Sequence, residues 1–116
     1  MSVHQITPED ELLRRIILQP QFFKITPDGV RRPTSAAFKM RSGEDGLSVD
    51  ILGLTSLEQA IANPATHTGA LLLAKVPLDQ NCPCVHDPVA GNPAHALIKN
   101  VTPALAKLFA VNARLL

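Results

Sequence analysis

Residue types that can perform chemistry gather in one short segment, residues 82–95. It holds both cysteines of the chain, two of its four histidines and an aspartate, set among three prolines and a glycine. Prolines and glycines in turns hold a loop in one shape, which a preorganised site requires. We therefore predict that the functional surface lies on the loop from Cys82 to His95.

Acid–base catalysis is one chemistry that these residues could support. An imidazole oriented by a carboxylate is the recurring arrangement of a general base. His86 and Asp87 are neighbours in the sequence, but neighbours on a strand point to opposite faces and need not interact. A partnership across strands is therefore favoured, in which Asp50 meets His86 or His95. The predicted catalytic set is His86, His95 and Asp50.

The cysteines are weaker evidence for a site, although Cys82, Cys84 and His86 are all permitted zinc ligands. On an extended strand, the Cα atoms of Cys82 and His86 would lie roughly 13 Å apart, too far for one ion. A turn at Pro83 could gather these residues with His95, yet one residue separates the cysteines where a zinc knuckle has at least two. The same spacing disfavours a disulfide and a redox pair. We predict no metal and no cofactor.

A second group of candidate ligand-binding residues is Arg31, Arg32 and Ser35, together with Asp87. Arginine offers paired donors to phosphate or carboxylate, and the serine hydroxyl adds another donor. Alternatively, the two arginines are solvated charges on an edge strand. Ser35 and Ser48 are also candidate nucleophiles, although neither lies in a Gly-x-Ser-x-Gly turn.

The composition narrows the class of protein. A chain of 116 residues with 46% apolar and 18% charged residues predicts one folded domain over residues 1–116. A net charge of +1, without Trp, Tyr or a basic stripe, disfavours nucleic acid as a partner. No apolar run approaches the ~20 residues of a membrane span, and no signal peptide is recognisable. These features predict a soluble cytoplasmic protein whose partner is a small molecule or another protein.

Three segments carry the signals of a helix start. Thr7-Pro8 and Thr102-Pro103 each combine a hydroxyl N-cap with proline at the first helical position. The first is expected to open a helix that ends before Pro20, with i,i+4 ion pairs to the two arginines at 14 and 15. Thr55-Ser-Leu-Glu58 resembles a capping box and predicts a helix to about residue 63. The apolar C-terminus after Thr102 is expected to pack on its own sheet or in a homodimer.

Strand signals lie between these helices. Residues 47–51 alternate strictly, with Ser48 and Asp50 on the polar side, and residues 70–76 are almost continuously apolar. Residues 22–26 and 30–32 predict a hairpin around Gly29. The remaining candidates are residues 36–41, 85–86 and 94–99. Strands and helices do not alternate regularly, so a doubly wound parallel sheet is disfavoured.

The predicted fold is α+β, with a mixed or mainly antiparallel sheet of about four to six strands and two or three helices packed on it. The predicted function is that of a binding or accessory module with its functional surface at the Cys82–His95 loop. The alternative is a small hydrolase or transferase that uses a His/Asp acid–base pair. No sequence pattern names a substrate or decides between the two.

Overall fold

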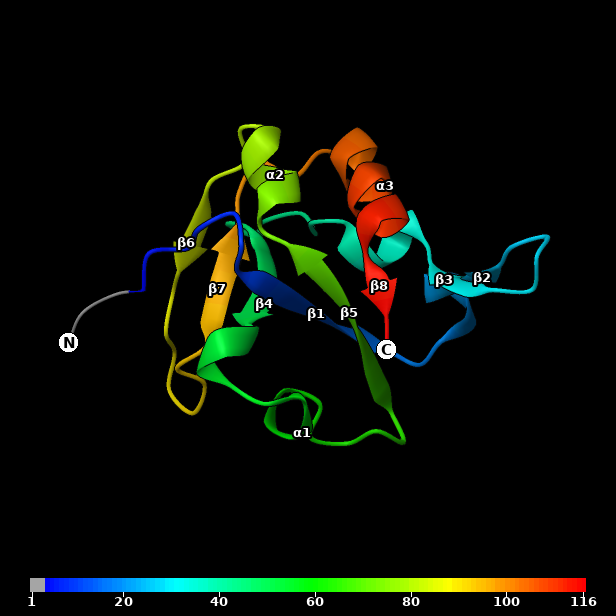
Figure 1. Cartoon of the computed structure of the whole chain (residues 1–116), viewed down its shortest axis with the longest axis horizontal. Helices are drawn as coiled ribbons and strands as arrows, with labels where there is room; N and C mark the ends of the chain where they lie inside the picture. The colour runs from blue at the N-terminus through cyan, green and yellow to red at the C-terminus, as the bar shows by residue number, and fades with distance from the viewer. Residues whose placement is uncertain (1–3) are drawn as a thin grey trace.

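A six-stranded antiparallel sheet with the strand order β6-β7-β4-β1-β5-β8 forms the centre of the computed structural model, which describes residues 4–116 (Figure 1). Its strands are β1 (Glu11–Ile17), β4 (Leu47–Ile51), β5 (His67–Leu73), β6 (Cys84–His86), β7 (His95–Ile98) and β8 (Arg114–Leu115). A separate hairpin consists of β2 (Phe23–Ile25) and β3 (Arg31–Pro33). The helices are α1 (Leu57–Ala60), α2 (Lys75–Asp79) and α3 (Pro103–Asn112). The predicted α+β fold is confirmed.

Three short 3₁₀ turns complete the chain: η1 (Pro20–Phe22), η2 (Ser35–Phe38) and η3 (Leu52–Leu54). Helix α3 and turn η2 pack on one face of the sheet, and the Phe38 and Phe109 rings meet edge to face with centroids 6.5 Å apart. The main core lies between them and strand residues such as Leu12 and Ile51. This burial of aliphatic and aromatic side chains is the main stabilisation of the fold.

The opposite face of the sheet is covered only in part. Leu13 and Leu71 form a small second cluster with Ala60, where η3 and α1 fold over the sheet. Away from this cluster, the side chains of β4 and β7 that alternate with core residues stay on the open face. They include Ser48, Asp50 and His95, because Val49 and its partner Ala96 are buried on the core side.

The predicted first helix is wrong, because residues 11–17 form the central strand β1. This strand pairs with β5 over seven residue pairs and with β4 over two. Its apolar residues serve both faces, with Leu12 in the main core and Leu13 in the second cluster. Thr7 and Asp10 form a local turn instead, in which the Thr7 amide donates to the Asp10 carboxylate. The expected ion pairs to the arginines are absent from the described part of the chain.

The other elements agree with the sequence to different extents. The hairpin, the strand at 47–51 and the two final strands are confirmed, and Gly29 has the positive φ of 82° that its turn requires. Residues 36–41 are not a strand, since η2 occupies 35–38. The apolar run at 70–76 is divided, with β5 ending at Leu73 and α2 beginning at Lys75.

Both predicted later helices are present, although α1 ends at Ala60 and not at about residue 63. Ser56, one residue after the expected cap, accepts a hydrogen bond from the Gln59 amide at 3.2 Å and starts the short α1. Thr102 caps α3 as predicted, accepting from the Leu105 amide at 3.2 Å. Helix α3 ends at Asn112, and the chain then turns into β8.

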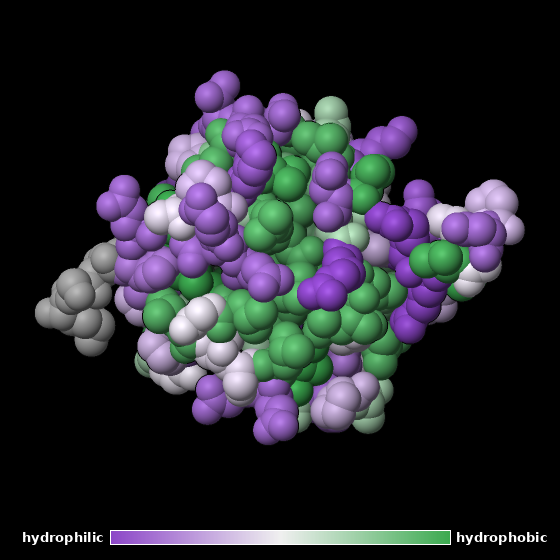
Figure 2. Space-filling model, viewed as in Figure 1, coloured by the Kyte–Doolittle hydropathy of each residue, from purple (hydrophilic) through white to green (hydrophobic). Residues whose placement is uncertain are grey.

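The apolar C-terminus packs on its own sheet. Leu115 pairs with Ala70 of β5, and the Leu116 amide donates to the Gly69 carbonyl at 3.0 Å. Figure 2 shows apolar surface in this region, to which the exposed Leu57 and Leu116 contribute. No helix within residues 4–116 is both long enough and apolar enough to cross a membrane.

Candidate functional site

A cleft opens on the sheet where β1 and β4 separate. The two strands pair only at Leu12–Ile51 and Leu13–Asp50, although β1 stays paired with β5 to its end. Beyond this point the Arg14 guanidinium lies between β1 and β4, donating from Nε to the Ala37 carbonyl at 2.8 Å and from Nη1 to the Ser48 carbonyl at 2.9 Å. The cleft beside it has a volume of about 470 Å³. The Arg14 side chain thus links β1 to β4 and to η2 where the two strands no longer pair.

The cleft is rich in positive charge. Four cationic side chains line it, Arg14 and Arg15 from β1 and Lys39 and Arg41 from the loop after η2, against the acidic Glu44 and Asp50. None of the four cations has a salt-bridge partner within residues 4–116. Burial lowers the pKa of Arg14, and the charge of Glu44 opposes this effect. An arginine pKa lies so far above neutrality that Arg14 stays charged.

Three residues at one side of the cleft are connected by close polar contacts. The Ser48 hydroxyl lies 3.2 Å from His95 Nε2. His95 Nδ1 lies 2.9 Å from the Asp87 carbonyl oxygen and 3.4 Å from its carboxylate Oδ2. Both neighbours of Nδ1 are acceptors, so Nδ1 carries the proton of the neutral ring. Nε2 is then unprotonated and accepts the hydrogen of the Ser48 hydroxyl.

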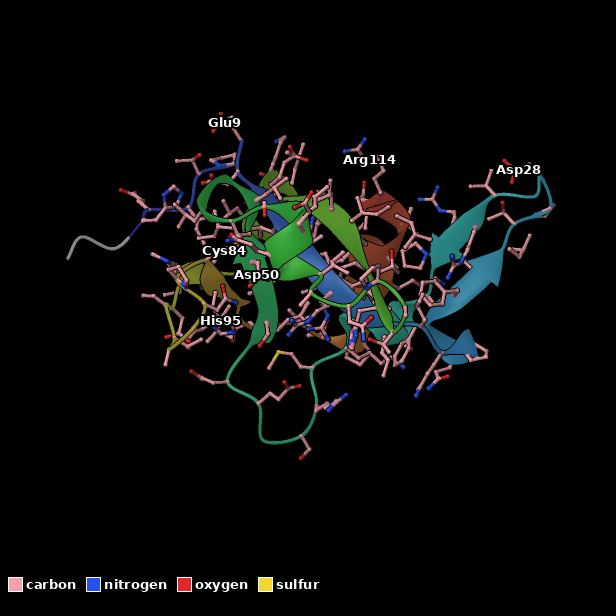
Figure 3. All side chains as sticks on the ribbon, turned by 90° about the horizontal axis from the view of Figure 1, so that it is seen from below. Glu9, Asp28, Asp50, Cys84, His95 and Arg114 are labelled. Atoms are coloured by element: carbon pink, nitrogen blue, oxygen red, sulfur yellow. The ribbon has the colours of Figure 1, made fainter. Side chains whose placement is uncertain are left out.

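Asp50 has a different partner from the one predicted. It lies directly opposite His95 in the β4–β7 ladder, and Figure 3 shows the two on the same part of the sheet. Its Oδ1 accepts a hydrogen bond from Asn92 Nδ2 at 2.7 Å, and Asn92 Oδ1 accepts from the Ala94 amide at 3.2 Å. Asp50 therefore fixes the loop before His95, and Asp87 is the carboxylate nearest the imidazole.

His86 does not reach the cleft. It pairs with Ala96, whose side chain faces the core, so it lies on the other face of the sheet from His95. His86 Nδ1 accepts from the His4 backbone amide at 2.8 Å, and Nε2 lies 2.7 Å from the Pro93 carbonyl oxygen. Both ring nitrogens are thus occupied in joining the N-terminal segment to the loop. The structure brings Asp50 beside His95 but leaves His86 apart.

The predicted arginine site lies elsewhere in the molecule. The hairpin that carries Arg31 and Arg32 projects from the opposite end to β6 and β7 (Figure 1). The Arg31 guanidinium stacks 4.1 Å from the centroid of the Phe23 ring, and Arg32 Nη2 donates to the Val111 carbonyl at 2.6 Å. Ser35 begins η2, whose next two residues line the cleft. The structure therefore separates these arginines from the Asp87 and His95 pair.

The two cysteines are free thiols outside the cleft. Cys82 is 1% exposed within the main core, and burial raises its pKa. Burial, together with the neighbouring Cys82, raises the pKa of Cys84 to about 12. Over residues 4–116 no three His, Cys, Asp or Glu side chains are grouped as ligands for a metal ion. Of this segment, Asn92 and His95 line the cleft, whereas the two thiols pack in or against the main core.

Sequence reasoning missed the cationic residues of the cleft, Arg14 above all. An adjacent pair of arginines inside an apolar stretch was a usable signal, because on a strand one of them must face the core side. Asn92 precedes Pro93, a sequence typical of a turn, and it forms that turn through its backbone contacts with Val89.

Comparisons with known proteins gave no similarity, since no family model, curated protein or solved structure matches the chain. A functional assignment therefore rests on the cleft itself.

Proposed function

We propose that the protein is a binding module that takes a small anionic molecule, a carboxylate or a phosphate, into the cleft between β1 and β4. The observation that carries this proposal is the set of four cationic side chains without acidic partners in the described chain. A volume of about 470 Å³ falls in the usual range for small-molecule pockets. Arg14 is half-buried and the other three cations are exposed. A charge held in a partly buried position attracts an anion more strongly than the same charge in open water.

Arg14 is the central residue of the proposed binding site. Two backbone carbonyls hold its guanidinium in place, so little conformational entropy is lost when an anion binds. The remaining nitrogen, Nη2, makes no hydrogen bond with residues 4–116 and is available to a ligand. The planar guanidinium suits the paired oxygens of a carboxylate or phosphate.

The rest of the lining sets the size and polarity of the ligand. The Ser48 hydroxyl and the His95 ring offer hydrogen bonds to a ligand, and Phe22 and Met40 add apolar surface to the lining. A ligand with one anionic group and a short apolar part fits this lining. Pockets of this kind combine apolar walls with a few fixed polar groups.

Isothermal titration with inorganic phosphate and with glutarate tests the proposal. Lys39→Ala/Arg41→Ala removes two cleft cations, and Lys107→Ala/Arg114→Ala removes two exposed cations outside the cleft. We expect the cleft pair to weaken binding about tenfold and the control pair less than about twofold, since charges outside the cleft act on the ligand only at long range, where salt screens them. Equal losses, or no saturable binding to the wild type, would contradict the proposal.

Two broader predictions accompany this function. A cytoplasmic location is supported by two free thiols, which a reducing compartment maintains.

A homodimer through the C-terminal segment would use Val111 and Leu116, which are exposed, because Phe109 is buried in its own core. Light scattering of the wild type against Leu116→Asp tests it, and a monomeric wild type would exclude it.

A further inference from the structure

We propose that Ser48 is a nucleophile activated by His95, and that the cleft hydrolyses esters of small anionic carboxylic acids. The proposal rests on the proposed anion binding, which would hold the acid portion of the substrate. It adds a chemical step carried by a different set of atoms, those of Ser48, His95 and Asp87.

The first support is the order of the hydrogen bonds. His95 Nδ1 has only acceptors beside it, the Asp87 carbonyl at 2.9 Å and carboxylate at 3.4 Å. Nε2, 3.2 Å from Ser48 Oγ, is therefore the basic nitrogen, in position to take the hydroxyl proton. A carboxylate beside Nδ1 stabilises the imidazolium that this proton transfer produces.

The second support is the rigidity of the base. The Asp87 amide donates to the His95 carbonyl at 2.8 Å, while the His95 ring donates back to the Asp87 carbonyl. The side-chain hydrogen bond between Asn92 and Asp50 holds the loop that joins Asp87 to His95. Ser48 itself lies within the regular strand β4. Both reacting groups are thus built on or tied to the sheet, as a catalytic pair requires.

The third support is the charge beside the nucleophile. Arg14 Nη1 donates to the carbonyl of Ser48 itself at 2.9 Å, so a guanidinium is fixed at the same residue. Negative charge that develops on a substrate carbonyl oxygen near Ser48 is stabilised by this cation and by the other cations of the cleft.

The proposed reaction has two steps. Ser48 Oγ attacks the ester carbonyl carbon while His95 Nε2 takes the hydroxyl proton, forming a tetrahedral oxyanion. The oxyanion collapses, the bond to the alcohol oxygen breaks, and His95 returns the proton to the departing alcohol, leaving an acyl ester on Ser48. Water then attacks this ester with His95 as the base, releasing the carboxylic acid and restoring Ser48.

The test uses mono-para-nitrophenyl glutarate as an anionic ester and para-nitrophenyl butyrate as its uncharged counterpart. We expect the wild type to release nitrophenolate from the glutarate ester faster than from the butyrate. Ser48→Ala and His95→Gln each lower the rate by about 100-fold, the usual size of a general-base contribution. Ser42→Ala and His4→Gln, which change the same residue types outside the cleft, retain the wild-type rate.

Intact-protein and peptide mass spectrometry during turnover identifies the acylated residue. A glutaryl adduct on Ser48, absent from Ser48→Ala, supports the proposal. An adduct only at another residue, or full turnover by Ser48→Ala, would overturn it. No turnover by a wild type that still binds glutarate in the titration would overturn the catalytic step and leave the binding function intact. A wild type that does not bind glutarate would contradict both the binding function and the catalytic step.

Discussion

Ser48 and His95 meet diagonally across the β4–β7 ladder, with Oγ 3.2 Å from Nε2. Their direct partners are Leu97 and Asp50, respectively, so the imidazole reaches along the open face of the sheet to the serine. Diagonal neighbours on antiparallel strands lie within reach of long side chains. Both residues line the cationic cleft.

The two histidines of the 82–95 loop should occupy opposite tautomers. The acceptors at His95 Nδ1 require the Nδ1-protonated ring, whereas the His4 amide at His86 Nδ1 requires the Nε2-protonated ring. Long-range ¹H–¹⁵N spectra at about pH 9, where imidazoles are neutral, distinguish the two forms. An Nε2-protonated His95 would show that its ring does not accept from Ser48.

Arg14→Met should destabilise the protein strongly. It removes both hydrogen bonds that satisfy the Ala37 and Ser48 carbonyls, and hydrogen bonds to charged groups are worth about 1.5–3 kcal/mol each. We expect a loss of about 2–4 kcal/mol in the free energy of unfolding, measured with urea. Arg41→Met, which removes an exposed arginine, should change it by less than about 0.5 kcal/mol. Similar losses in both variants would contradict the role given to Arg14.

Gly69→Ala should also lower stability, through crowding. A Cβ at Gly69 would lie 2.6 Å from Leu13 Cδ1 and 3.0 Å from Ile61 Cδ1, inside the second cluster. Both atoms are the ends of side chains that can rotate, so we expect a loss near the lower end of the overpacking range, about 1 kcal/mol. Gly53 has open space around its Cβ position, so Gly53→Ala is the matched control and should be nearly neutral. Equal thermal midpoints for the two variants would argue against this packing.

The thiols should be unreactive in the folded protein and should make its stability depend on pH only in the alkaline range. The Cys84 pKa of about 12 exceeds its ordinary value of 9.0, so the folded state keeps a proton that the unfolded state releases. Stability from this source is complete below about pH 9 and falls as pH rises toward 12. Cys84→Ala should lose less stability than the wild type over this interval.

The reactivity of the thiols gives a second measurement of their burial. Ellman's reagent at about pH 8 should react rapidly with both thiols only in denaturant, because the thiolate is the nucleophile. Rapid reaction of the folded protein would contradict this burial.

Local signals in the sequence were sufficient where a segment has only one way to bury its side chains. The strict alternation of 47–51 predicted the open-face position of Ser48 and Asp50, and the Thr102-Pro103 cap predicted α3. The segment 11–17 fits either a helix or a strand, because its paired apolar residues match both periods. Pairing with β4 and β5 stabilises the strand. These partners are distant in the sequence, so the pattern of residues 11–17 alone does not predict the pairing.

Only the histidine and carboxylate residues of the candidate site could be predicted from the sequence, and its cations could not. His95, Asp50 and Asp87 come from the loop and strand whose patterns were clear. The cations come from β1 and from the loop after η2, which long-range sheet pairing and the docking of η2 bring to the same place. Their convergence could not be predicted while β1 was assigned to a helix.

The most direct test of the cleft as the functional site is an amide chemical-shift map of the ¹⁵N-labelled protein titrated with glutarate. Saturable shifts should gather at residues 14–15, 39–41 and 48–50 and at His95, the segments that line the cleft. Residues 31–32 of the hairpin and 82–86 should be unaffected. Shifts confined to those two segments, or spread evenly over all exposed cations, would contradict the account.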